Sequence, residues 1–122
     1  MKAVEPPIVN PMATPESVSR PLVCDLSAID ASNRIRHRDL LLKLRAASRD
    51  WRETTDGYSF RVVAEAMPLT DVAEWMGLER LCCPFLNLAL QVAGDQEDCW
   101  LTITGPAGAK PIIEAELGAN SI

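Results

Sequence analysis

An Asp-Gly pair between two stretches of alternating residues constrains the fold of this chain more than any other feature. Asp56 and Gly57 are typical of a tight β-turn, and they separate residues 51–55 from residues 58–64. Successive side chains of a strand point to opposite faces of a sheet. The pattern therefore predicts a β-hairpin whose second strand turns four side chains toward a core: Tyr58, Phe60, Val62 and Ala64.

A second alternating pattern lies closer to the C-terminal end. Residues 94–98 form an acidic, glycine-containing turn between two further strand-like stretches. The apolar positions of the first stretch are Leu86, Leu88, Leu90 and Val92, and those of the second are Cys99, Leu101 and Ile103. These residues predict a second hairpin.

Three helices are expected around the two hairpins. Ser27 and Asp30 are candidate caps for a helix that ends near Ser48, and its apolar residues include Ile35 and a leucine cluster at Leu40, Leu41, Leu42 and Leu44. A second helix should run from about Thr70 to Cys82, begin with a capping box made by Asp71 and Glu74, and end before Pro84. A short third helix has Pro111 near its start and Gly118 as its cap.

The order helix, two strands, helix, two strands, helix predicts an α+β two-layer sandwich. Its four-stranded, mainly antiparallel sheet would carry all helices on one face. The other face would be open, and covering it is a reason to expect a homodimer. An alternative function follows from this arrangement: a non-catalytic, homodimeric interaction module with structural, buried cysteines, which binds a protein partner through its N-terminal arm or its open sheet face.

Length and composition limit the domain count, the cellular compartment and the classes of partner that we expect for this chain. The 122 residues suit one domain over residues 22–122, preceded by a flexible tail over residues 1–21, where five of the nine prolines lie. A net charge of −5 disfavours nucleic acid as a partner. No apolar run is long enough to span a membrane, and no apolar signal segment follows Lys2. We therefore expect a cytoplasmic protein whose four cysteines are mostly free thiols.

The adjacent Cys82 and Cys83 concentrate the unusual chemistry of the chain. Neighbouring cysteines do not easily ligate one tetrahedral zinc ion, whereas soft ions such as mercury, copper(I) or arsenite accept irregular thiolate sets. Thiol redox chemistry is the other hypothesis for this pair. In either case Cys99 would add a third sulfur, and Glu79 and Arg80 would contribute charge. The end of a helix disfavours a thiolate, so we expect binding or slow oxidation rather than enzymatic catalysis. The competing interpretation makes these cysteines part of the core.

Three other features of the sequence are considered as parts of a site. The turn formed by Gly105, Gly108 and Lys110 resembles an anion site, although a plain strand-to-helix turn explains it as well. His37 has no ligand-spaced neighbour and is assigned to the surface. Cys24 is an incidental thiol unless the segment after the tail folds back over the cysteine pair.

Three sequence blocks resemble a family of small bacterial proteins of uncharacterised function. The blocks are DGYSFR at 56–61, ERLCCPFL at 79–86 and LTITGPAGAK at 101–110, and the similarity spans roughly residues 26–117. The resemblance implies a heavy-metal-resistance context and nominates Glu79, Arg80, Cys82 and Cys83. Together with the residue chemistry, it favours a small protein that binds soft metal ions or acts in thiol redox.

Overall fold

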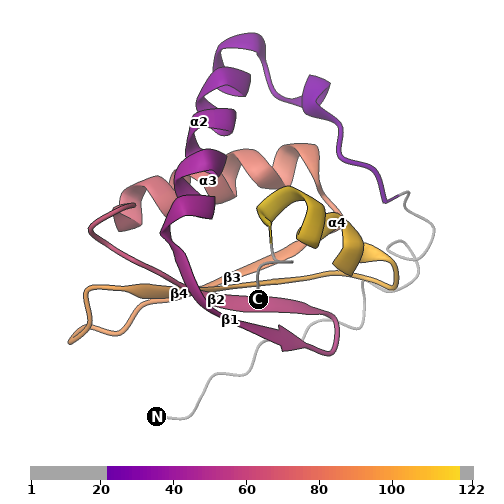
Figure 1. Cartoon of the computed structure of the whole chain (residues 1–122). Helices are drawn as coiled ribbons and strands as arrows, with labels where there is room; N and C mark the ends of the chain where they lie inside the picture. The colour runs from indigo at the N-terminus through magenta and orange to yellow at the C-terminus, as the bar shows by residue number, and fades with distance from the viewer. Residues whose placement is uncertain (1–21, 119–122) are drawn as a thin grey trace.

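The computed structural model describes residues 22–118, and the predicted tail at 1–21 lies outside them. The chain folds into helices and four strands with an α+β arrangement (Figure 1). They are the short 3-10 helix η2 (Leu26–Ala28), α2 (Ala31–Ala47), β1 (Ser48–Thr54), β2 (Gly57–Val62), α3 (Leu69–Cys82), β3 (Asn87–Gln91), β4 (Cys99–Thr104) and α4 (Ala109–Leu117). The predicted order of helices and strands is confirmed.

The four strands form one fully antiparallel sheet in the order β1-β2-β4-β3. The two hairpins therefore join through β2 and β4, which pair Tyr58 with Ile103 and Phe60 with Leu101. Gly57 lies where β2 begins, and a Cβ atom at this position would overlap the carbonyl oxygen of Ile103. The Asp-Gly turn thus serves the pairing with β4 as well as the hairpin itself.

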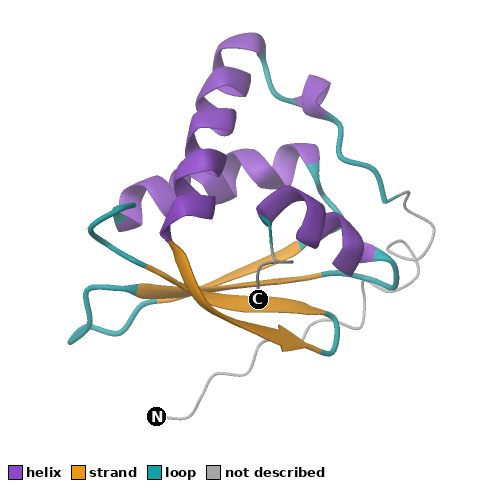
Figure 2. Cartoon of the chain, viewed as in Figure 1, coloured by secondary structure: helices purple, strands orange, loops and turns teal. Residues whose placement is uncertain are grey.

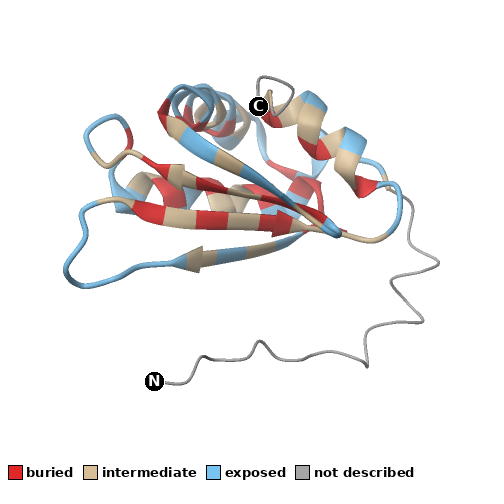
Figure 3. Ribbon diagram, turned by 60° about the horizontal axis from the view of Figure 1, so that its bottom comes forward, coloured by how far each residue is buried: buried red, intermediate tan, exposed pale blue. Residues whose placement is uncertain are grey.

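The helices all cover the same face of the sheet, which makes a two-layer sandwich (Figures 1 and 2). Along the two central strands, β2 and β4, buried and half-buried residues alternate, as the red and tan bands of Figure 3 show. The predicted inward residues Tyr58, Phe60 and Val62 are buried, and so are the three predicted for β4. Ala64 follows the end of β2 and is only half-buried.

The open face of the sheet is largely polar. Ser59 and Thr102 share a hydrogen bond across β2 and β4, and the Arg61 guanidinium pairs with Asp98. Arg52 lies over the ring of Trp100. The polar side chains of the open face therefore pair with one another within the chain. The homodimer stays a prediction. Among the described residues, no helix is both long and apolar enough to cross a membrane.

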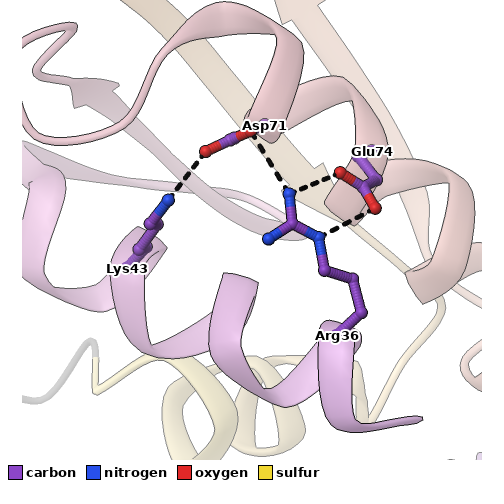
Figure 4. Close-up of polar contacts among 4 residues, drawn as sticks. All are labelled: Arg36, Lys43, Asp71 and Glu74. Carbon is purple, nitrogen blue, oxygen red and sulfur yellow. Dashed lines mark hydrogen bonds and ion pairs between the residues drawn. The ribbon is translucent and has the colours of Figure 1, made fainter. Parts of the chain in front are cut away.

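The start of α3 differs from the predicted capping box. The helix begins after Pro68, and no side chain caps it. Asp71 and Glu74 instead pair with Arg36 on α2, and Asp71 also pairs with Lys43 (Figure 4). The prediction was wrong because these two carboxylates face cations on a neighbouring helix, a tertiary contact that spacing along one helix does not report.

The apolar face of α2 is also narrower than predicted. Asp30 caps the helix by accepting a hydrogen bond from the Asn33 amide, as expected, whereas Ser27 lies in η2. Leu40 and Leu44 are fully buried, but Ile35 and Leu42 are 68% and 49% exposed. The buried stripe is His37, Leu40, Leu44 and Ala47, with the three-four-three spacing of one helix face.

Candidate thiol and carboxyl site

Four parts of the chain meet at the C-terminal end of α3. The helix supplies Glu79 and Cys82 and is followed by Cys83; α2 supplies His37, and α4 supplies Glu116. The segment before η2 folds back over this end, where the Asp25 amide donates to the Cys82 carbonyl at 2.7 Å. That contact gives a partner to one of the carbonyls that a helix end leaves unpaired. It also brings Cys24 to the cysteine pair.

Cys24 and Cys83 form a disulfide across 59 positions of sequence, with their Cα atoms 4.6 Å apart. The Sγ atom of Cys82 lies 3.5 Å from the Sγ atom of Cys83, so three sulfurs are in contact. Cys24 is exposed and the other two are buried. Two of the four cysteines are thus not free thiols, contrary to expectation, because the N-terminal segment docks on α3.

His37 lies inside the molecule, so its predicted surface location was wrong. Its side chain is 5% exposed, and Nε2 lies 2.8 Å from Oε1 of Glu79, which is fully buried. Burial lowers the pKa of His37 below its ordinary 6.5. The histidine occupies the buried stripe of α2, and its three-residue spacing from Leu40 was the signal for this location.

The Cys82 thiol is held in its protonated form. Burial, followed by the nearby carboxylates of Glu79 and Glu116, raises the pKa of this thiol to about 12. Its Sγ atom lies 3.8 Å from Oε1 of Glu79, within reach of a weak S–H hydrogen bond. The sequence predicted that this helix end would disfavour a thiolate, and the raised pKa of Cys82 has the same direction. The neighbouring Glu79 and Glu116 raise this pKa further.

Glu116 brings a second carboxyl group to the cluster. Burial, then the charge of Glu79 and a hydrogen bond with it, raises the pKa of Glu116 from 4.5 to about 9. Burial also raises the pKa of Glu79. When both acids are ionised, Oε2 of Glu79 is buried without a donor, whereas a protonated Glu116 can donate to Glu79. Sequence reasoning missed Glu116, although it lies four residues after Ile112 and three after the buried Ile113 on α4.

A pocket of about 770 Å³ opens onto this cluster. Its apolar lining comes from η2, α2 and α4, and Arg34 and Arg38 lie among the lining residues. His37, Cys24, Cys82 and Glu116 reach the same pocket. Molecules from solution therefore have a route to the sulfurs and to Glu116.

The structure separates two of the predicted site residues from this cluster. Cys99 is buried on β4 opposite Val62, and it belongs to neither of the two groups of close metal-ligating side chains found in residues 22–118. Arg80 is exposed and lines a different hollow, beside Met76 and Leu88. Glu79, Cys82 and Cys83 are the predicted residues that do come together.

The turn at Gly105, Gly108 and Lys110 already has internal partners. The Gly105 amide donates to the Asp56 carbonyl, and Lys110 pairs with Glu53 and lies over the ring of Tyr58. Gly108 has a φ of 95°, which suits the glycine that precedes α4. These contacts describe a strand-to-helix turn.

Comparisons with protein-family models, curated proteins and solved structures find no match for this chain. The family membership suggested by the three sequence blocks therefore stays a prediction. Function has to be argued from the site: an exposed end of a disulfide, a buried thiol in contact with it, two carboxyl groups and an imidazole.

Proposed function

We propose that the chain is a thiol-redox protein that cycles between the Cys24–Cys83 disulfide and two thiols. The observation that carries this proposal is the row of three sulfurs, in which the Cys82 thiol lies 3.5 Å from Cys83 and the Cys24 end is exposed. A disulfide with one accessible sulfur is open to exchange. In a reducing compartment, such as the cytoplasm expected from the sequence, disulfides are usually transient and functional.

The reaction uses a small-molecule or protein thiol as reductant. Its thiolate attacks Sγ of Cys24, the accessible sulfur, and the Cys24–Cys83 bond breaks with its electron pair on Cys83. The Cys82 S–H group donates a hydrogen bond to the departing Cys83 thiolate, which then takes a proton. A second thiolate attacks the mixed disulfide, releases the oxidised reductant and leaves Cys24 reduced. Two external thiols are oxidised for each protein disulfide reduced.

The test equilibrates the native protein in glutathione buffers of graded potential, then traps free thiols by alkylation and counts them by mass spectrometry. We expect a reversible two-electron step in which Cys24 and Cys83 become alkylated together while the protein stays folded. Cys24→Ser and Cys83→Ser should each abolish the step. Cys82→Ser should retain the step but slow it, and Cys99→Ser is the matched control that should change nothing.

Reduction that occurs only as the protein unfolds would overturn this proposal. The cysteines would then be structural, as the interaction-module alternative requires. Alkylation of Cys24 and Cys83 in every buffer would overturn it too, because no disulfide would exist to cycle.

Capture of soft metal ions by the reduced protein is a second candidate function. A donor atom of Glu116 and the sulfurs of Cys24 and Cys83 lie within 4.8 Å of one another, and Cys82 adds a third sulfur. Three thiolates suit arsenite, mercury(II) or copper(I). Cys24, rather than Cys99, would be the third sulfur.

Arsenite added to the reduced protein tests this second function. We expect one arsenic per chain by native mass spectrometry and a higher melting temperature. Serine at Cys24, Cys82 or Cys83 should prevent binding, whereas Cys99→Ser should not. Binding that survives all three substitutions would place the ion elsewhere and exclude this site.

A further inference from the structure

We infer that His37, Glu79, Cys82 and Glu116 form a binding site for a borderline divalent cation, with zinc as its natural occupant. The site goes beyond the redox function, because it leaves out the two cysteines of the disulfide. It also differs from the soft-metal candidate, since it combines nitrogen, oxygen and one sulfur donor rather than three sulfurs.

The donor atoms have the separations that such an ion requires. Nε2 of His37, a carboxylate oxygen of Glu79 and Sγ of Cys82 all lie within 4.8 Å of one another, and the closest pair is 2.8 Å apart. A tetrahedral zinc ion holds its ligands about 3.3 to 3.8 Å from one another, given the usual Zn–N, Zn–O and Zn–S bond lengths. The His37–Glu79 pair, 2.8 Å apart, would have to open slightly to accommodate the ion, and the Glu79–Cys82 pair, 3.8 Å apart, is already close to the required separation.

The chemistry of the donors points to zinc rather than to a harder or softer cation. Imidazole and thiolate bind calcium and magnesium poorly, because those ions prefer oxygen ligands. A single sulfur among nitrogen and oxygen donors is equally unsuited to the softest ions. One nitrogen, two carboxylates and one sulfur fall within the range that zinc and cobalt(II) accept.

Burial and charge give an independent reason to expect a cation. Glu79 is 0% exposed, and its buried Oε2 atom has no hydrogen-bond partner in the described part of the chain. Buried carboxylates in proteins are normally paired with a cation or coordinate a metal. In residues 22–118 no lysine or arginine pairs with Glu79 or Glu116, whereas Asp71 and Glu74, acids of the same helix α3 that water reaches, pair with Arg36 and Lys43.

The fourth ligand and the entry route come from α4 and the pocket. Glu116 lies near enough to Glu79 to raise its own pKa, and it lines the pocket of about 770 Å³ together with His37 and Cys82. An ion can therefore reach three of the four ligands from solution without opening the core. Because Glu79 lies behind them, it would bind from the interior side and fix the ion against α3.

Cobalt(II) is the probe for the experiment, because its absorption reports both sulfur ligation and coordination geometry. Disulfide-bonded protein titrated with cobalt(II) should bind one equivalent and show a thiolate-to-cobalt charge-transfer band with intense visible bands of four-coordinate cobalt. Zinc(II) should displace the cobalt. Absence of the charge-transfer band in the folded wild-type protein would overturn the inference.

Variants identify the ligands and separate this site from the redox function. Cys82→Ser should remove the charge-transfer band, and Cys99→Ser, the matched buried thiol, should leave it intact. His37→Gln and Glu79→Gln should weaken binding by at least about 100-fold, the upper end of what loss of an outer-shell partner costs. Glu116→Gln should weaken it by about 10-fold or more and alter the visible bands.

The Cys24→Ser/Cys83→Ser double variant has no disulfide to cycle, yet it should bind cobalt(II) as the wild type does. Loss of binding in that variant would show that the disulfide cysteines hold the ion, which contradicts this site. Retention there, combined with a failed redox titration, would leave the zinc site standing and remove only the redox function.

Discussion

Two charged clusters join the same pair of helices, and they differ in how their charges are balanced. On the surface, Arg36 and Lys43 of α2 meet Asp71 and Glu74 of α3, two cations against two acids (Figure 4). One turn further along α3, the buried Glu79 meets His37 of α2 and Glu116 of α4. No permanently charged cation lies in that second group. The acids of the surface cluster are paired with cations, whereas Glu79 and Glu116 of the buried cluster have no lysine or arginine partner within residues 22–118.

The difference also separates structural from functional roles. Exposed ion pairs contribute little to stability, because water screens them and long side chains lose freedom on pairing. Buried acids without a cation destabilise the charged state and are typical of functional sites. The first cluster orients α2 on α3, and the second holds the groups on which the proposed chemistry depends.

Replacing the central acid of the buried cluster should have the largest effect. Glu79→Ala leaves a void and a buried His37 without its partner, so the free energy of unfolding should fall by about 2 to 4 kcal/mol. Urea unfolding measures the loss. Glu74→Ala, on the exposed face of α3, is the control and should shift the urea midpoint far less. Equal shifts in the two variants would abolish the contrast between the clusters.

The pH dependence of stability should be intermediate in size. The folded metal-free protein keeps a proton on Glu116 up to about pH 9, while the unfolded chain releases it near 4.5. Raising the pH between these values therefore favours unfolding, and the melting temperature should fall by roughly 10 °C from pH 7 to pH 9. Glu116→Gln should flatten this slope, and Glu65→Gln, an exposed acid, should not.

The pH window is chosen so that the His37 imidazole and the Cys82 thiol contribute little, while Glu79, whose pKa burial also raises, acts in the same direction as Glu116. Burial lowers the pKa of His37, so its effect has the opposite sign and lies below pH 6.5. The raised pKa of the Cys82 thiol matters above pH 9.0. Arg34 and Arg38 of α2 line the same pocket. A melting temperature that rises from pH 7 to pH 9 would contradict the assignment.

The surface cluster should give the smallest effect. Arg36→Ala removes the guanidinium that bridges Asp71 and Glu74, and the melting temperature should fall by about 3 °C or less at low salt. The difference from wild type should shrink as salt is added, because the screening length shortens. A large, salt-independent loss would mean that this cluster carries more of the α2–α3 contact than its exposure suggests.

Much of the fold followed from local patterns. Alternation at Tyr58, Phe60 and Val62 predicted strand β2, the Asp-Gly pair predicted the first hairpin, and Pro84 with Gly118 marked where two helices end. Each of these signals depends on residues a few positions apart. The α2 face was less well predicted, because Ile35 and Leu42 are apolar yet exposed.

Local sequence patterns predicted only part of the candidate site. Glu79, Cys82 and Cys83 were found because they are neighbours on one helix end. His37 and Cys24 were not, since their partners lie 42 and 59 positions away. No sequence pattern within α4 connects Glu116 with the cysteines. Its spacing from Ile112 and Ile113 nevertheless places it on the apolar side of that helix.

The helices and strands of this protein follow from local patterns, because hydrophobic periodicity and turn residues act within a few positions of the chain. The same patterns place the adjacent thiols at the end of α3. The surroundings of these thiols depend on how the elements pack. Packing α2, α4 and the N-terminal segment against that helix end places two acids and an imidazole beside three sulfurs, and loss of contact with water is what shifts the pKa values of these groups.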